Sequence, residues 1–596
     1  MKYFLMLFCI ILLIGCEKAI DHNLLNKRVL FDRETALTKA DLIMNNKIYV
    51  WDLWEPIDYK DRIQWNINPY NSDSWVLYFH SLRMVGILAR AYEYNQEDKY
   101  IEKAMVILRS WVEYNKTNLD NIYQDHMVAN RVLNISHLYF VAPNILKTDD
   151  KKLIESIILE HGEWLYNDQN YTKGNHAIMQ DRALMQASLT FSTFKDDEWY
   201  NKSLERVTKT FDAEITSEGV CVENSPGYHP YVMDLLQNFI VMGENFNRPF
   251  PEKYKMEYEK MVGFLTYIIK PNNKFPTFGD TYFTNSTLHF SNLYKSQELL
   301  FVDTKGLKGI KPAFTDKVYQ ESGYAIFREG WKKGEEFSKQ TQLSFINTNQ
   351  SFVHKHSDYL SFELYSNNED LIVDAGHIGY NKDSITAYLK STIAHNTITI
   401  DNRNINYYKV PLYEGARITN FNSNDTSAHL KAFVKPDTNT TFKRDIIYVK
   451  PNAFILIDRY ELTKIQDEKM FQQAFNLGGK LLDIEKNGSD RLIAKYPNNN
   501  LHFIQKTKTE KVNIFKAEKN LRGTVADGPL KFRKGTQIVF EKDIRRKNEP
   551  FITLLLIEND KNGNIPAEDI DIYFDNPLLI VSWNNGSQKL VININD

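Results

Sequence analysis

Cysteine is almost absent from this 596-residue chain, which contains three. Cys9 and Cys16 lie in an apolar N-terminal segment, so Cys221 is the single cysteine of the chain's body and no disulfide framework is expected. A basic surplus is also missing, because 73 Lys and Arg face 76 Asp and Glu, a formal net charge of −3. Without that surplus or a long Lys/Arg run, we expect no nucleic-acid partner.

Long hydrophobic runs are missing too, except for FLMLFCIILLIG directly before Cys16. A basic start at Lys2, a short apolar stretch and a small residue at its end predict a secretory signal over residues 1–15. The Leu-Ile-Gly-Cys ending resembles a bacterial lipobox, which predicts lipidation of Cys16 and a periplasmic or cell-surface lipoprotein. Contact with a membrane is then expected only through this lipid anchor. A plain signal peptide or a membrane anchor is the alternative, although the run is short for a spanning helix.

The composition is that of a folded protein, with 43% hydrophobic and 25% charged residues, and the length predicts two or three domains. The first half carries apolar residues at three- and four-residue spacing, which predicts helices. The segments are 73–94, 97–115, 128–146, 152–168, 176–191 and stretches near 198–214, 229–246 and 254–269. Stacked helical hairpins form either a solenoid or an incomplete (α/α) toroid, and the lack of a fixed-period repeat favours the toroid.

From residue 322 onward, short alternating segments such as TQLSFIN, FKRDIIYVK and ITLLLIEND are separated by polar turns. This pattern predicts a large antiparallel β-sandwich. We therefore expect a multidomain α+β protein with a helical domain over 16–310 and a sandwich over 311–596. A small C-terminal β layer is expected from about residue 500.

Histidine and aspartate gather in the segment from Phe352 to Thr399. His354 and His356 are two residues apart, which on a strand would point them to one face; Asp374 and His395 follow. A His/Asp/His set suits a divalent ion such as zinc. The alternative is that these are ordinary polar residues on a sheet.

Two loop motifs stand out in the helical half. Asn175 and His176 precede a helix, where Asn175 also suits an N-cap. Glu223-Asn224-Ser225-Pro226-Gly227-Tyr228-His229 leads into another helix, where Tyr228 can equally serve as a packing anchor.

Together, Asn175-His176, the Glu223–His229 motif and the His354…His395 series resemble the heparinase II/III superfamily of polysaccharide lyases. The resemblance extends over roughly residues 60–480, and its fold, an (α/α) toroid followed by a β-sandwich, matches the independent prediction.

The resemblance implies β-elimination at a uronic acid, with an acidic polysaccharide as partner. Asn175, assisted by His176, would neutralise the sugar carboxylate, and Tyr228 and His354 would transfer protons. His356, Asp374 and His395 would hold a zinc ion, Zn²⁺, of structural rather than catalytic role.

Glu223, Arg131 and Lys173 are further candidates for substrate contacts. A glycosaminoglycan such as heparan sulfate or hyaluronan is the favoured substrate, with alginate or another bacterial exopolysaccharide as alternative. A glycoside hydrolase using carboxylates such as Asp181, Glu223 or Asp280 stays open, as does a non-catalytic glycan-binding lipoprotein.

Overall fold

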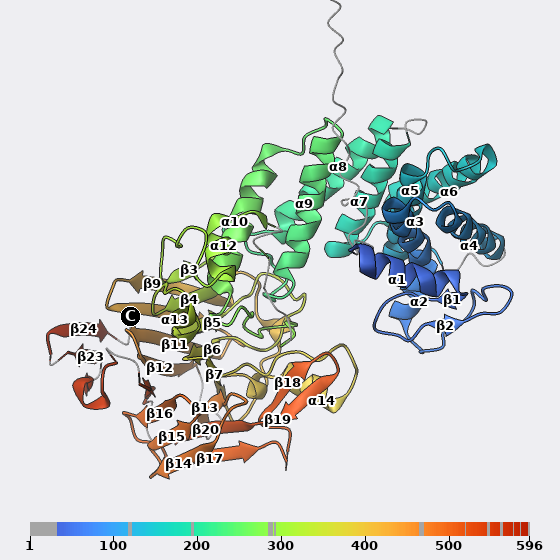
Figure 1. Cartoon of the computed structure of the whole chain (residues 1–596). Coiled ribbons are helices and arrows are strands. Elements are labelled where there is room, and N and C mark those ends of the chain that lie inside the picture. Colours follow the sequence, from blue (N-terminus) through green and yellow to red (C-terminus); the bar gives the residue numbers. More distant parts are fainter. Residues whose placement is uncertain are drawn as a thin grey trace, which may run out of the picture. The chain divides into compact units, whose positions relative to one another are not determined.

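The computed structural model describes residues 32–593, apart from 117–121, 192–195, 284–289, 291–293, 464–469, 519, 545–548, 561–563, 576 and 585 (Figure 1). The predicted signal segment and Cys16 therefore lie outside the described residues. The chain divides into two compact units. The helical unit comprises the described residues of Met1–Asp212 with Leu235–Lys255, and the sheet unit comprises Ala213–Asp234 with the described residues of Met256–Asp596.

The helical unit is built from helices that, apart from α1, overlap the predicted segments. They are α1 Arg33–Met44, α2 Asp73–His80, α3 Arg83–Asn95, α4 Lys99–Asn115, α5 Asp125–Val141, α6 Thr148–Tyr166, α7 Asn175–Thr190 and most of α8 Asp196–Glu214. Two further helices, α9 His229–Asn245 and α10 Glu252–Ile268, are shared between the two units. A short hairpin pairs β1 Lys47–Ile48 with β2 Ile57–Asp58.

One predicted helix, 73–94, is in fact two. Leu82 adopts a left-handed backbone conformation (φ 55°) between α2 and α3, which interrupts the helical hydrogen bonds. The periodicity alone could not reveal this break, because Leu82 is itself buried and keeps the apolar pattern.

A five-stranded antiparallel sheet carries the loops of the candidate site. Its order is β3 Lys317–Tyr319, β4 Tyr324–Arg328, β5 Gln342–Ile346, β6 Ser361–Ser366 and β7 Glu369–Ile372. The prediction of a strand through His354 and His356 is wrong, because residues 351–360 form turns that lead into β6 and His354 has a left-handed backbone (φ 53°). Short helices α12 Gln297–Asp303, α13 Glu335–Lys339 and α14 Ser384–Leu389 complete this part.

The other large sheets enclose the main core of the sheet unit. An eight-stranded sheet has the order β14-β15-β16-β21-β12-β11-β10-β9, and a four-stranded sheet the order β17-β20-β13-β8. Their bounds are β8 Ile398–Ile400, β9 Ala416–Ser423, β10 Ser427–Val434, β11 Thr440–Val449, β12 Ala453–Leu462, β13 Met470–Asn476, β14 Asp483–Asn487, β15 Arg491–Lys495, β16 Asn500–Gln505, β17 Lys511–Lys516, β20 Thr536–Asp543 and β21 Phe551–Glu558. A hairpin of β18 Thr524–Gly528 and β19 Lys531–Lys534 adjoins α14.

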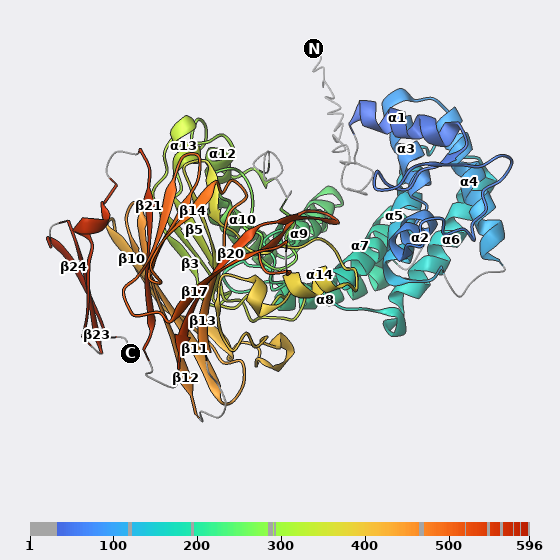
Figure 2. The ribbon, with the colours of Figure 1, turned by 90° about the horizontal axis from the view of Figure 1, so that it is seen from below.

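The C-terminal β layer begins later than expected. Strands β16, β20 and β21 belong to the large sheets, so residue 500 is no boundary. The separate small sheet consists of β22 Asp571–Asp575, β23 Leu578–Trp583 and β24 Gln588–Asn593 (Figure 2). Its apolar side chains, Val581 and Trp583 among them, pack with Ile447 and Ile455 on the outer face of the eight-stranded sheet.

A buried ion pair joins the eight-stranded sheet to the site loops. Arg444 donates two 2.7 Å hydrogen bonds to the carboxylate of Asp458, and its third nitrogen reaches the carbonyl oxygens of Leu360 and Asn396. Both charged side chains are completely buried. With all these groups satisfied, the pair fixes the loops before β6 and β8 against β11 and β12.

The predicted fold class is confirmed: a helical N-terminal part precedes antiparallel sheets. Among the described residues, no helix is long and apolar enough to cross a membrane.

Candidate active site

Three distant backbone segments meet at Gly279. Its φ of +54° favours glycine, and a Cβ here would lie 2.5 Å from the carbonyl oxygen of Asn224 and 2.7 Å from that of His354. Asn224, itself left-handed (φ 55°), donates hydrogen bonds to the carbonyl oxygens of Ser351 (3.0 Å) and Val353 (2.9 Å). This contact brings the Glu223–Tyr228 turn beside the loop of His354.

His354 and Tyr228 are sequence-predicted residues that the sheet unit brings together, with Glu223 beside them. Their rings stack with centroids 3.7 Å apart. His354 Nδ1 lies 2.8 Å from Asp280 Oδ2, and Nε2 lies 3.5 Å from a carboxylate oxygen of the buried Glu223. An ionised carboxylate only accepts hydrogen bonds, and Asp280 is within hydrogen-bond distance whereas Glu223 is not, so the proton is assigned to Nδ1 and Nε2 is left as the basic nitrogen.

Tyr380 was missed by the sequence analysis. Its hydroxyl lies 2.7 Å from that of Tyr228 and 3.2 Å from His354 Nδ1. Burial raises the pKa of Tyr228 to about 12, although the hydrogen bond with Tyr380 lowers it in part. Burial and the charge of Asp280 raise the pKa of Tyr380 well above its usual value. Both phenols are therefore protonated at neutral pH, so Tyr228 is suited to act as an acid.

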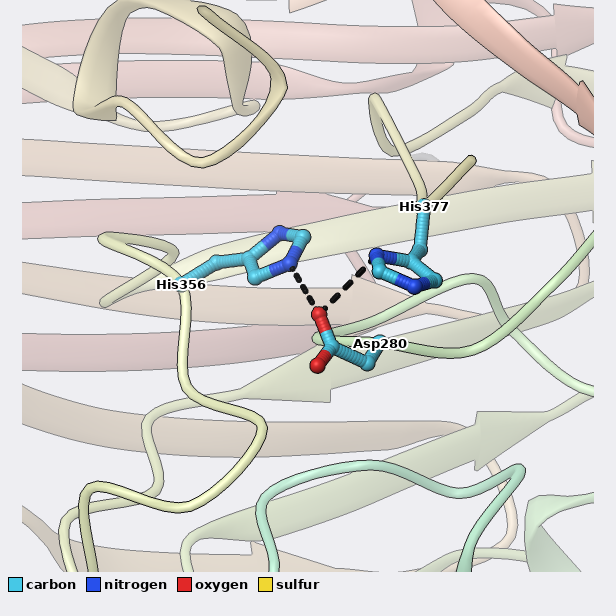
Figure 3. Close-up of side chains that lie close together, drawn as sticks. All are labelled: Asp280, His356 and His377. Carbon is cyan, nitrogen blue, oxygen red and sulfur yellow. Dashed lines mark hydrogen bonds and ion pairs between the residues drawn. The ribbon is translucent and has the colours of Figure 1, made fainter. Parts of the chain in front are cut away.

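Asp280 is the centre of this cluster and was named from sequence only as a carboxylate for the hydrolase alternative. Oδ1 lies 2.9 Å from His356 Nε2, 3.0 Å from His377 Nδ1 and 3.0 Å from Lys390 Nζ (Figure 3). Burial alone would raise the pKa of Asp280, but hydrogen bonds from His354, His356 and His377 hold it far below its usual range. Asp280 is thus a fixed negative charge beneath His354.

The predicted metal ligands divide into two groups. His395 Nδ1 lies 3.0 Å from both carboxylate oxygens of Asp374, which also accepts a hydrogen bond from Ser361. His356 turns instead toward Asp280 and His377, with its ring 5.7 Å from that of His395. His377 was not predicted, although it lies only three residues beyond Asp374.

Asp280, His356 and His377 fit a metal ion. Each is buried, and one ligand atom of each lies within 4.8 Å of the others. One carboxylate oxygen and two imidazole nitrogens are a donor set that divalent transition metals accept. The second ring nitrogens of His356 and His377 are buried with no hydrogen-bond partner among the described residues. Both rings are thus held mainly through the nitrogens that converge on Asp280.

The remaining predicted residues lie in the helical unit. Asn175 is the first residue of α7, so Gly174 rather than Asn175 is the N-cap. His176 Nδ1 lies 2.7 Å from Asp125 Oδ2, and its ring stacks on His126 at 3.8 Å. Burial alone would raise the pKa of Asp125, but hydrogen bonds with His176 and the His126 backbone lower it to about 2. Asn175 and His176 thus share one helix end beside a fixed carboxylate.

Arg131 is a correction to the predicted substrate contacts. Its side chain is completely buried, and it donates hydrogen bonds to His161 Nε2 and to the carbonyl oxygens of His80 and Ile122. The guanidinium also lies 4.4 Å from the ring centre of Trp111. All of these contacts are internal, so Arg131 stabilises the helices rather than facing a ligand. Lys173, by contrast, is exposed just before α7.

Two family models match this chain. The heparinase II/III N-terminus model matches residues 19–308, and the heparinase II/III-like C-terminal model matches residues 311–550. The chain belongs to the heparinase II/III superfamily.

Among superfamily members, a heparin-sulfate lyase of Pedobacter heparinus is 22% identical over 506 residues, covering 81% of this chain and 74% of that protein. A heparin-sulfate lyase of Bacteroides thetaiotaomicron is 23% identical over 554 residues, covering 85% and 76%. The crystal structure of a heparan sulfate lyase from Pedobacter heparinus aligns with a TM-score of 0.74 at 20% identity, covering 95% of this chain and 90% of that one. A heparinase III structure aligns at 0.73 and 18% identity, covering 94% and 91%. These structures share the fold.

The carboxyl group of Glu214, which is influenced by the charge of Glu223, predicts that the stability of the protein depends on pH. Burial, together with the charge of Glu223, raises the pKa of Glu214 from 4.5 to about 7. The folded state therefore binds a proton that the unfolded state has released, and stability falls as pH rises from about 4.5 to 7. Glu214→Gln should accordingly stabilise the protein by about 3 kcal/mol at pH 8 and by almost nothing at pH 4.

Thermal unfolding at the two pH values measures this effect. The matched control is Glu414→Gln, because Glu414 is an exposed carboxylate of the same unit. An equal shift in both variants, or a shift of Glu214→Gln that does not depend on pH, contradicts the prediction.

Proposed function

We propose that this chain is a polysaccharide lyase that cleaves a uronic-acid-containing glycosaminoglycan by β-elimination, with heparan sulfate as the favoured substrate. The observation that carries the proposal is the Tyr228–His354–Asp280–Tyr380 cluster, in which a protonated phenol stacks on an imidazole whose basic nitrogen is set by a buried carboxylate. The names of the superfamily relatives, heparin-sulfate lyase and heparan sulfate lyase, support the substrate class.

Elimination requires a base for the proton at C5 and an acid for the leaving oxygen at C4. His354 Nε2 takes the C5 proton, and the electron pair of that bond forms the C4–C5 double bond as the C4–O bond breaks. The Tyr228 hydroxyl gives its proton to the departing sugar oxygen. The imidazolium formed at His354 lies between Asp280 and Glu223, whose carboxylates are positioned to stabilise it.

The C5 proton is weakly acidic because the adjacent carboxylate is ionised. A donor must therefore meet that carboxylate as charge accumulates on it. We assign this role to the side-chain amide of Asn175, with His176 held beside it by Asp125. The Tyr380 hydroxyl can donate to Tyr228, since His354 Nδ1 already carries its own proton. That hydrogen bond stabilises the Tyr228 phenolate left after proton transfer.

Product absorbance tests the proposed reaction. Each elimination creates a 4,5-unsaturated uronate that absorbs in the near ultraviolet, and hydrolysis creates none. Incubation with heparan sulfate should raise the absorbance, while hyaluronan, chondroitin and alginate define the substrate range. New reducing ends without absorbance would indicate a hydrolase, and binding without any cleavage would indicate a glycan-binding protein.

We propose zinc as the ion of the Asp280–His356–His377 group. The bound ion would order the loops beneath His354 and supply positive charge there. Elemental analysis of the purified protein tests for zinc, and His377→Ala and His395→Ala separate the two ligand sets. Loss of zinc from His377→Ala alone supports this assignment, whereas loss from His395→Ala alone supports the Asp374–His395 set.

We also propose that Cys16 is lipidated and tethers an exported protein. The support is the apolar run and the Leu-Ile-Gly sequence before Cys16. Mass spectrometry of the mature N-terminus tests this, and an unmodified N-terminus beginning elsewhere would contradict it.

A further inference from the structure

The outer face of the eight-stranded sheet contains a hollow of about 400 Å³ across β9, β10, β11 and β12. Its charged lining residues are Lys431, Lys435, Lys443, Arg459, Asp445 and Glu461, and together they form what we call the cationic hollow. Four cations against two carboxylates give it a net charge of +2, in a chain whose formal net charge is −3.

Strand alternation places the hollow opposite the candidate active site. On β11, Arg444 points into the core, where it reaches the carbonyl oxygens of Leu360 and Asn396. Its neighbours Lys443 and Asp445 must point to the other face. A sugar that occupies the hollow is therefore separated from His354 by the sheet itself.

The outer face changes character along these strands. Ile447, Ile455 and Ile457 are buried, and they pack in the core that the small C-terminal sheet shares. The same face becomes charged at Asp445, two residues before Ile447 on β11, and at Arg459, two residues after Ile457 on β12. The hollow thus lies on the same outer face as the apolar contact with the C-terminal sheet, next to that contact.

The floor of the hollow is a built charge network. The side chain of Asp445 is 1% exposed, pairs with Arg459 and lies 3.0 Å from His429 Nε2. At the rim, Lys443 Nζ lies 2.6 Å from Glu461, although both side chains are partly exposed. These contacts neutralise both carboxylates of the hollow.

The excess positive charge belongs to Lys431 and Lys435. No carboxylate within the described ranges forms an ion pair with either lysine. Lys435 Nζ lies 5.4 Å from the ring centre of Phe433, which also lines the hollow. The other two cations, Lys443 and Arg459, are direct cross-strand partners, and each is already paired with a carboxylate.

We propose that the cationic hollow is a second binding site for the acidic polysaccharide, holding a segment of chain distant from the bond that is cleaved. Sulfate and carboxylate groups pair with Lys431, Lys435 and Lys443, and the ring of Phe433 supplies an apolar surface for a sugar face. The identity of the polymer rests on the proposed function. The site itself holds long chains near the enzyme between cleavage events.

Binding of fluorescently labelled heparan sulfate tests the proposal, with Tyr228→Phe present in every protein so that the polymer is cut too slowly to affect the measurement. Lys431→Ala with Lys435→Ala should weaken binding of the long polymer by about five- to tenfold in low salt, and less as salt screens the charges. The protein with the two lysine substitutions and the protein without them should differ less in their affinity for a labelled tetrasaccharide. A tetrasaccharide cannot occupy the hollow and the candidate active site at once.

The matched control is Lys511→Ala with Lys516→Ala, which removes the same charge from exposed positions on β17. Equal weakening by both pairs would mean that only overall charge matters and would overturn the proposal, as would no weakening by the hollow pair. Product absorbance measured with the unsubstituted protein tests the lyase reaction separately. The second binding site and the lyase activity can therefore fail independently of each other.

Discussion

Replacing Tyr228 with phenylalanine is expected to lower the rate of elimination by about a thousandfold, the middle of the range for loss of a positioned acid. The substitution removes the hydroxyl that gives its proton to the leaving oxygen. It keeps the ring that stacks on His354 at 3.7 Å, so the loops should retain their positions. The initial rate of product absorbance measures the effect, with thermal unfolding and zinc content as checks on the fold.

Tyr380→Phe is the matched control for this experiment. It removes the 2.7 Å partner of Tyr228 but leaves the acid itself in place, so a loss of only about tenfold is expected. Full activity of Tyr228→Phe would remove Tyr228 from the reaction. A larger loss for Tyr380→Phe than for Tyr228→Phe would make Tyr380 the acid instead.

Asp280→Asn is expected to lower the rate by about a thousandfold as well, for a different reason. The carboxylate of Asp280 accepts a hydrogen bond from His354 Nδ1 and so defines which ring nitrogen is basic. An asparagine can turn its NH₂ group toward Nδ1, which would move the imidazole proton to Nε2. In serine proteases, the equivalent Asp-to-Asn change lowers kcat by about 10⁴ because the histidine takes the wrong tautomer.

Three further groups share the charge of Asp280, since His356, His377 and Lys390 all lie within 3.0 Å of Oδ1. Asp280→Asn should therefore also reduce zinc content. Asp316→Asn is a suitable control, because Asp316 is another buried carboxylate of the sheet unit and pairs with Lys450 at 2.6 Å. It should lower thermal stability but leave the activity of the folded protein in place. Retained activity in Asp280→Asn would show that His354 does not need this partner.

The architecture could be predicted because it depends on patterns that repeat along the chain. Amphipathic helices bury one face, so a segment such as 97–115 shows its period directly. FKRDIIYVK indicates a strand by its β-branched and aromatic residues, because β11 is buried on both faces over most of its length. Local departures from regular helix or strand could not be seen in the sequence pattern. Leu82 breaks a helix while keeping its apolar character, and the loop through His354 and His356 has the alternation of a strand without its backbone.

The site was predicted in part for a related reason. Tyr228, His354 and Asn175 lie in distinctive short motifs, whereas Asp280, Tyr380 and His377 gain their meaning only from contacts with distant residues. Asp280 follows Gly279 in a loop without regular structure, and nothing in its neighbours indicates that three histidines converge on it. The burial of Arg131 likewise depends on helices far away in sequence, so its interior position was not visible.

The crowded backbone at Gly279 also has a consequence for folding. The residues that meet there, Asn224 and His354, come from opposite sides of Gly279 in the sequence and are separated from it by long stretches of chain. Contacts of high sequence separation form slowly, since long loops must close before they can be made. After dilution from denaturant, helix content should therefore return well before the His354–Asp280 pair exists. Enzymatic competence would then be among the last properties that a refolding molecule regains.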